Sequence, residues 1–376
     1  MNIKRQPLYA LLATILFVGS ACRQQHPGAV AVGALVPLSG PNMSYGTACR
    51  QAYEIARDDA KRLGRAELNV IYGDSLMEVG PTLRQYQDLK RKVVAFVEVA
   101  GSGPALAVSA EAAKDRIPIL SAIASSPKLT ADGGDYFFRV IPSDEHSAPA
   151  LSEWALEAGL KRAVMVFNQQ NAWATGFKEA AVTAYRQRGG LLPDDAVIAV
   201  TRDTLDFSAA IAALKRKSPD VWFVGLQGAQ AGLFVSQALD KGVAQPFLGV
   251  DNFDEQEFVD AAGRAKTQVR FVLPAVAKSD AAQRFAAEFR ARFNREPGGL
   301  AFRAYDAFML LVSVVESVQK AGLPLDGVHL QAALRQTRME GLTGTIEFDD
   351  NNDLKRAAYT LWTYTPDGRL TPAPQR

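Results

Sequence analysis

Two serine-containing turns and one aspartate have the chemistry to hold a small polar molecule. Ser102 follows one apolar run, Ser125 follows the next, and Asp251 follows another run further along the chain. A serine hydroxyl and free backbone N–H groups at the start of a helix can bind a carboxylate. An aspartate at such a place suits a ligand with an amine or another hydrogen-bond donor. These residues predict the binding of a small molecule.

A plainer explanation exists for each of these residues. Serine is a frequent N-cap, so Ser102 and Ser125 could serve only to begin helices. Asp251 could cap a helix that we expect to begin near Glu255. The sequence leaves both the binding role and the capping role open.

The sequence does not indicate catalysis. Its three histidines, His26, His146 and His329, do not form a recognisable metal-binding motif with a cysteine or another ligand. The pairs Asp58-Asp59 and Asp349-Asp350 would point their side chains apart on a helix or strand, which does not suit acid–base chemistry. A hydrolase would need a Ser/His/Asp arrangement that we do not find. We expect no enzyme activity, no catalytic residue, no metal and no cofactor.

Two motifs partly match known ligand-binding loops. Gly101-Ser102-Gly103 is similar to a dinucleotide-binding turn, but Leu106 stands where that fingerprint has Gly or Ala. The segment 351–353 is rich in Asn and Asp, but it lacks the ligand spacing and the terminal glutamate of a calcium loop. We interpret it as a hairpin turn.

Short apolar runs alternate with amphipathic helical stretches, which is the pattern of βα units and a parallel sheet. The stretch 32–41 indicates a buried strand that ends in a polar turn, where ligands bind in open α/β sheets. The other expected strands are 68–72, 93–97, 117–120, 163–167, 197–200, 221–224, 247–250, 345–348 and 358–364. The expected helices are 45–63, 81–90, 105–114, 148–157, 175–188, 207–215, 281–293 and 299–320. We predict an α/β fold of two doubly wound parallel-sheet lobes, which the region after 269 completes by crossing back.

The N-terminus has the pattern of a secretory signal. Lys4 and Arg5 precede the apolar run 8–18, which is shorter than the ~20 residues of a membrane-spanning helix. Small residues then lead to Cys22, as in the lipobox of bacterial lipoproteins, although Gly19 stands where that pattern usually has Leu. We expect a signal peptide at 1–21 and acylation of Cys22; ordinary cleavage and an uncleaved anchor are the alternatives.

Composition agrees with an exported protein. The chain has 376 residues, 48% of them hydrophobic, which is enough for two cores. Without Lys4 and Arg5, its 42 basic residues become 40, equal to its 40 acidic residues. This balance of charges does not indicate a nucleic-acid-binding protein. We expect Cys49, the second cysteine, to be a small buried hydrophobic residue.

Several segments, in the same order from about Ala31 to the C-terminus, resemble the type I periplasmic binding proteins, and more narrowly their branched-chain amino acid branch. They are Pro37-Leu38-Ser39-Gly40-Pro41, Tyr45-Gly46, Gly101-Ser102-Gly103, Ile117-Pro118-Ile119-Leu120-Ser121, Phe137-Phe138-Arg139, Pro142-Ser143-Asp144 and Ala304-Tyr305-Asp306-Ala307. The resemblance implies two lobes that are joined by three crossovers and close on a ligand. It assigns 29–143 and 275–357 to lobe 1, and 144–274 and 358–376 to lobe 2.

The same resemblance implies a set of ligand-binding residues. Ser102 and Ser125 match family residues that hold a carboxylate, and Asp251 matches an acidic residue that holds an ammonium group. Tyr45 matches an aromatic rim residue, whereas Trp173 and Gln227 stand where tyrosines are usual. The expected site is Tyr45, Ser102, Ile123, Ser125, Trp173, Gln227 and Asp251.

The function that follows is that of an ABC importer's substrate-binding protein for an amino acid or a related small carboxylate or amide. We expect a periplasmic, membrane-anchored lipoprotein that is a monomer and works with ABC permease subunits of the inner membrane. The alternative is a cell-envelope regulatory or sensor lipoprotein that uses the same shape to bind a partner protein. A polar cleft would favour transport, and an apolar cleft would favour the regulator.

Overall fold

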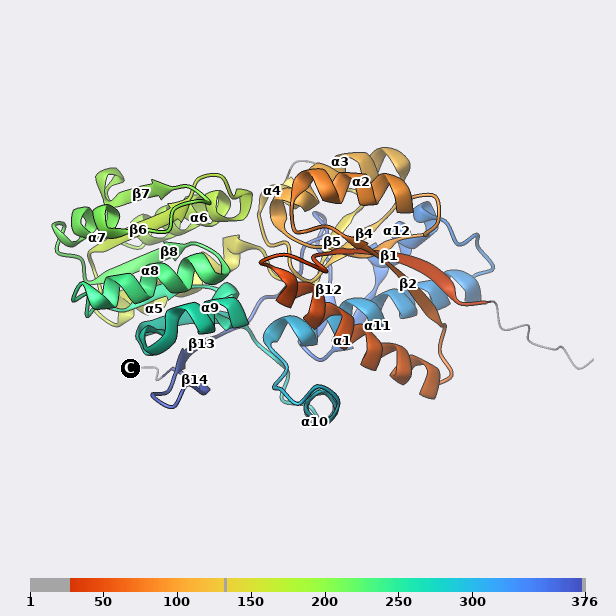
Figure 1. The fold of residues 1–376 in the computed structure, drawn as a ribbon. Coiled ribbons are helices and arrows are strands. Elements are labelled where there is room, and N and C mark those ends of the chain that lie inside the picture. The colour runs from red at the N-terminus through yellow and green to blue at the C-terminus, as the bar shows by residue number, and fades with distance from the viewer. Residues whose placement is uncertain (1–27, 132–133, 374–376) are drawn as a thin grey trace, which may run out of the picture.

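The computed structural model describes residues 28–131 and 134–373, so the expected signal peptide and Cys22 lie outside the described residues. Two β-sheets with their helices lie side by side and form two lobes (Figure 1). We call the unit built on the five-stranded sheet lobe 1 and the unit built on the seven-stranded sheet lobe 2. The two-lobed α/β fold predicted from the sequence is confirmed.

Lobe 1 is built on a parallel sheet with the strand order β2-β1-β3-β4-β5. Its strands are β1 (Val30–Val36), β2 (Leu68–Asp74), β3 (Phe96–Val99), β4 (Ile119–Ser121) and β5 (Phe137–Arg139). Its helices are α1 (Met43–Arg62), α2 (Val79–Leu89), α3 (Ser102–Asp115), α4 (Lys128–Ala131), α10 (Asp280–Phe293), α11 (Gly299–Lys320) and α12 (Gly327–Gln336), beside a ribbon of β11 (Arg338–Gly341) and β12 (Gly344–Glu347). One hydrophobic core lies under α1 and α11, and a second lies under α2 and α3.

Lobe 2 is built on a sheet with the order β14-β13-β10-β9-β8-β6-β7, in which β13 pairs antiparallel with β10 and with β14 and the other described pairs are parallel. Its strands are β6 (Ala163–Asn168), β7 (Val197–Val200), β8 (Val221–Gly225), β9 (Phe247–Gly249), β10 (Val269–Pro274), β13 (Tyr359–Tyr364) and β14 (Leu370–Pro372). Its helices are α5 (Asp144–Glu157), α6 (Ala172–Gln187), α7 (Ser208–Lys215), α8 (Gly228–Asp240) and α9 (Gln256–Ala262), with short 3-10 turns η1 (Asp194–Ala196), η2 (Asp251–Asp254) and η3 (Gly263–Gln268). One continuous core joins these elements.

The sequence pattern finds most of the larger elements but misses several others, which are β5, β10, β11, β14, α4 and α8. β5 is only three residues long, and Arg270 interrupts the apolar run of β10. α8 contains Gly232, which lowers helix propensity. A Cβ at Gly232 would lie 2.6 Å from the carbonyl oxygen of Phe258 in α9, so the glycine allows these two helices to pack closely. Cys49 is buried in the core of lobe 1, as predicted.

The chain crosses between the lobes in three places, at 140–143, 275–279 and 348–358. A buried ion pair joins the end of β5, just before the first crossing, to the third crossing. Arg139, at the end of β5 and fully buried, donates from Nη2 to Asp353 Oδ2 over 2.8 Å and makes a second bond from Nε to Oδ1 of the same carboxylate. Asp353 lies in the turn predicted at 351–353, which is closed by a bridge between Phe348 and Leu354. The pair therefore fixes the turn at 351–353 to lobe 1.

We expect Asp353→Asn to destabilise the protein because Arg139 would stay buried without its counter-ion. Removing one partner of a buried pair typically lowers the free energy of unfolding by about 3–5 kcal/mol. Urea unfolding, followed by circular dichroism, measures the loss. The matched control is Asp240→Asn, which breaks an exposed pair with Arg264 and should change stability by less than about 1 kcal/mol. Equal, small losses in both variants would contradict the prediction.

Candidate functional site

The predicted site residues surround one small cavity between the lobes. Lobe 1 contributes Tyr45 from α1, Ser102 from the start of α3, and Ile123 and Ser125 from the turn after β4; lobe 2 contributes Trp173 from α6, Gln227 from the start of α8 and Asp251 from the end of β9. The strands that lead to these residues end at the lobe boundary, where ligands bind in α/β sheets. The cavity volume is about 20 Å³, which is room for about one water molecule.

Further residues that the sequence reasoning missed line the same cavity. They are Met77, Gly101, Asn252, Leu300 and Arg303. Arg303 is the most informative because it is a charged residue on the buried side of α11, with only 3% of its side chain exposed. Its spacing from Leu300 and Ala307 places it on the apolar stripe of that helix. A charge on such a stripe is the signal that could have found it.

Arg303 and Asp251 form an ion pair across the boundary between the lobes. Arg303 Nη2 donates to Asp251 Oδ2 over 2.7 Å, and Arg303 Nε donates to the carbonyl oxygen of Ala122 over 3.0 Å. Asp251 makes no capping hydrogen bond to α9. The alternative interpretation of Asp251 as a helix cap is therefore wrong. The sequence analysis predicts that Asp251 binds the ammonium group of a ligand. In the structure, the Asp251 carboxylate instead contacts the guanidinium of Arg303.

The two serines also do not act as simple N-caps. α3 begins after Gly101 without a side-chain cap, and Ser102 Oγ instead accepts a hydrogen bond from the Ser126 backbone N–H over 3.2 Å. Ser125 Oγ donates to Asp144 Oδ2 over 3.0 Å. Because the Ser102 hydroxyl acts as an acceptor here, its own proton is still available for a ligand carboxylate.

Asp144 is a buried carboxyl group behind this part of the cavity. It accepts hydrogen bonds from Ser125 and Ser147, each over 3.0 Å. Burial, and secondly the charge of Asp251, raise the pKa of Asp144 to about 7. Its protonation state therefore decides whether Ser125 donates to it or accepts from it.

The remaining walls are aromatic or held by neighbouring side chains. Burial raises the pKa of Tyr45 well above its usual value, so the phenol stays neutral. Trp173 is 5% exposed and stacks on Phe177, with 5.5 Å between the ring centroids. Gln227 Oε1 accepts a hydrogen bond from Asn171 Nδ2. Contacts within the protein therefore hold the Trp173 and Gln227 side chains in place.

Other polar contacts join the lobes around the cavity. Ser44 Oγ donates to Glu257 Oε2 over 2.6 Å, and the Gly299 backbone N–H donates to Asp254 Oδ2 over 3.0 Å. Burial is the largest cause that raises the pKa of Asp254 to about 6. An acidic segment of lobe 2, residues 251–257, thus packs against the N-terminal ends of α1 and α11 in lobe 1. This is an arrangement that helix dipoles favour.

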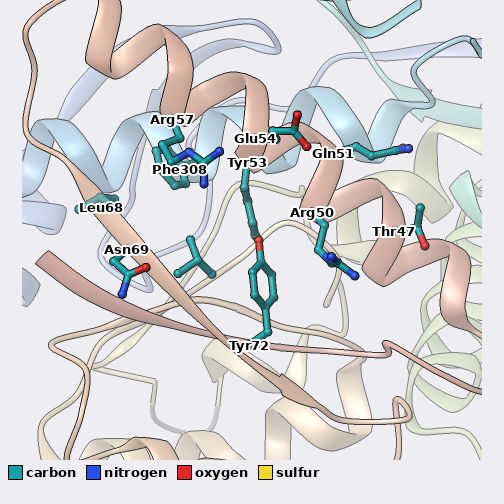
Figure 2. Close-up of a pocket in the computed structure, with 11 residues that line it drawn as sticks. Thr47, Arg50, Gln51, Tyr53, Glu54, Arg57, Leu68, Asn69, Tyr72 and Phe308 are labelled. Carbon is teal, nitrogen blue, oxygen red and sulfur yellow. The ribbon is translucent and has the colours of Figure 1, made fainter. Parts of the chain in front are cut away.

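A separate hollow lies on lobe 1 between α1 and β2 (Figure 2). Its volume is about 430 Å³, and polar side chains line most of it. The Arg50 guanidinium carbon lies 5.7 Å from the centroid of the Tyr72 ring. None of the predicted site residues lines this hollow.

Residues 28–131 and 134–373 contain neither a cluster of metal ligands nor a helix that could cross a membrane. No group of three or more His, Cys, Asp or Glu side chains in these ranges is placed to hold a metal ion. Each helix in the same ranges is too short or too polar to cross a membrane.

The chain matches the model of a known protein family over most of its length. The match covers residues 29–369, and the family is described as periplasmic binding protein. The chain belongs to the periplasmic binding protein family. Membership implies an extracytoplasmic protein that binds a solute and is not an enzyme.

Individual relatives of this periplasmic binding protein cover nearly its whole length. The Leu/Ile/Val-binding protein homolog 3 of Brucella melitensis is 24% identical over 98% of this chain and 99% of its own. The crystal structure of a leucine-binding protein from Thermotoga maritima has a TM-score of 0.85 and 21% identity, over 92% of this chain and 98% of that one. A solute-binding protein from R. palustris in complex with benzoate has a TM-score of 0.80 and 21% identity, over 92% of this chain and 95% of that one. These structures have the type I periplasmic binding protein fold.

Asp144 should make the stability of this periplasmic binding protein depend on pH. Its pKa is about 7 in the folded chain and about 3.9 in the unfolded chain, so unfolding releases its proton between these values. The free energy of unfolding should therefore fall as pH rises from about 4 to about 7, by up to about 1.4 kcal/mol per pH unit from this group. Asp144→Asn should remove this contribution in urea unfolding at about pH 5, 6 and 7.

Asp203→Asn, on an exposed loop, is the control and should keep the full pH dependence of the wild type. The Asp144 assignment would be wrong if Asp144→Asn followed the wild type in parallel across this range.

Proposed function

We propose that this periplasmic binding protein captures an amino acid or a related small carboxylate or amide in the interlobe cavity, and passes it to the permease of an ABC importer. The observation that carries the proposal is that residues of both lobes, including Ser102, Ser125 and Asp251, line one cavity. The names of the Brucella and Thermotoga relatives support an amino acid ligand, and the benzoate complex supports a wider class of carboxylates. Polar residues in the cavity favour a small solute over a partner protein.

Binding would proceed by rotation of the lobes about the three crossings. In this proposal, lobe 1 comprises 29–143 and 275–357, and lobe 2 comprises 144–274 and 358–376. Separation of the lobes would open the cavity, and closure would bury the ligand. We also propose that a signal peptide at 1–21 directs export, that Cys22 is acylated as a membrane anchor, and that the protein acts as a monomer.

A thermal-shift screen tests the ligand class. The purified protein, stripped of bound solute by unfolding and refolding, is screened against amino acids, their amides, and aliphatic and aromatic acids. A ligand present at a hundredfold excess over its Kd should add about 2.7 kcal/mol to the free energy of unfolding and so raise Tm. If no compound raises Tm, the transport proposal is wrong.

An engineered disulfide tests the closure. Gly103 in α3 and Ala172 in α6 face each other across the lobe boundary, and a Cβ at Gly103 would lie 3.6 Å from the Ala172 Cβ. This separation suits a disulfide. The oxidised Gly103→Cys/Ala172→Cys variant should bind a ligand from the screen at least about tenfold more slowly than the reduced form, because the lobes could not separate.

Stopped-flow fluorescence measures these association rates, and the two single-cysteine variants are the controls. Equal rates for the oxidised and reduced double variant would show that entry does not require the lobes to open.

A further inference from the structure

The ion pair in the cavity joins two charges that belong to different lobes. Arg303 is held on lobe 1 by its bond from Nε to the carbonyl oxygen of Ala122, over 3.0 Å. Asp251 begins η2 of lobe 2. When the lobes separate, each charge therefore stays with its own lobe and the 2.7 Å contact between them breaks.

A ligand of amino acid size needs more room than the closed cavity provides, so side chains that line the cavity must move apart to admit it. The cavity between the lobes measures about 20 Å³, and Arg303 and Asp251 both line it. A guanidinium has five N–H donors, of which Nε and Nη2 of Arg303 bind Ala122 and Asp251. The Nη groups are the ones that an incoming carboxylate would meet.

Charge balance then decides which ligand can replace the direct contact. An anion would pair with Arg303 and leave Asp251 without a cation, whereas a cation would pair with Asp251 and leave Arg303 without an anion. An uncompensated charge in a closed site is strongly unfavourable. A zwitterion satisfies both side chains, because its carboxylate faces Arg303 and its ammonium group faces Asp251.

The surroundings further disfavour a simple anion. Asp144 is buried and Asp254 is half-buried near Asp251, and the charge of Asp251 contributes to the raised pKa of both carboxyl groups. Glu255 is half-buried, and its pKa is raised chiefly by desolvation and secondly by the charge of Asp254. A ligand that brought a negative charge without a positive one would add to this crowding of acidic groups.

We infer that Arg303 and Asp251 form a two-charge clamp that selects zwitterionic ligands, with Arg303 as the residue that binds the carboxylate. This inference rests on the proposed function and narrows it, since amine-free acids and neutral amides would be poor ligands. Ser102 would add a hydrogen bond to the same carboxylate. Arg303 is thus a specificity-determining residue of the site.

Matched sets of three compounds test the clamp. Each set holds an amino acid, the same skeleton without the amine, and the same skeleton without the carboxylate: leucine, 4-methylpentanoate and 3-methylbutylamine; glutamine, 4-carbamoylbutanoate and 4-aminobutanamide; phenylalanine, 3-phenylpropanoate and 2-phenylethylamine. Calorimetry on the full, solute-stripped protein measures each Kd. In at least one set the amino acid should bind at least about a hundredfold more tightly than both analogues.

Single substitutions should shift this preference in opposite directions. Arg303→Gln should weaken the amino acid and improve the relative binding of the amine, because Asp251 loses its partner. Asp251→Asn should weaken the amino acid and improve the relative binding of the amine-free acid. A folding defect would weaken all three compounds together, so the crossover is specific to the clamp. Arg264→Gln, in the exposed pair with Asp240, is the control and should leave every Kd unchanged.

The outcomes separate the two proposals. Amine-free acids that bind as tightly as the amino acids, or variants without the crossover, would overturn the clamp and leave the solute-binding function intact. No binding of any compound in these sets or in the thermal-shift screen would overturn both. Tight binding of one zwitterion together with the crossover would establish Arg303 as its carboxylate anchor.

Discussion

A buried charge has to be neutralised, and two buried arginines of this protein, one beside the crossings and one in the cavity, each pair with an aspartate. At the crossings, Arg139 is fully buried and is balanced by Asp353. In the cavity, Arg303 is 3% exposed and is balanced by Asp251. The first pair lies within lobe 1 and is kept whatever the lobes do. The second pair spans the boundary, so only its contact depends on how the lobes are placed.

The sheets provide the frame for the second pair. Parallel strands of both lobes end at the boundary, so the turns after them meet there even though they are far apart in sequence. Arg303 comes from α11, which follows lobe 2 in the chain yet packs against α1 in the core of lobe 1. The return of the chain to lobe 1 therefore places the guanidinium of Arg303 in the cavity. The serines and the aspartate of the cavity come from the turns after strands. A shorter chain without α11 would have the serines and the aspartate but no guanidinium.

The sequence could predict the positions that follow a regular rule. Ser102, Ser125 and Asp251 each follow an apolar strand, and the expectation that strand ends converge is enough to group them. Arg303 obeys no such rule, because its partner Asp251 lies on another lobe and only the packing of α11 brings the two together. Its bond to Ala122 likewise depends on that packing. Asp353 was similar: the sequence indicated its turn correctly, but not that its carboxylate enters the core to meet Arg139.

The anchored turn at 349–353 has a consequence for the thermodynamics of closing. Arg139 ties the third crossing to the end of β5, so the third crossing leaves lobe 1 close to the residue at which the first crossing begins. In the proposed opening, this attachment would restrict the relative orientations that the two lobes can take. The proposed closure would then lose less conformational entropy, and more of the interaction with a solute would remain as affinity.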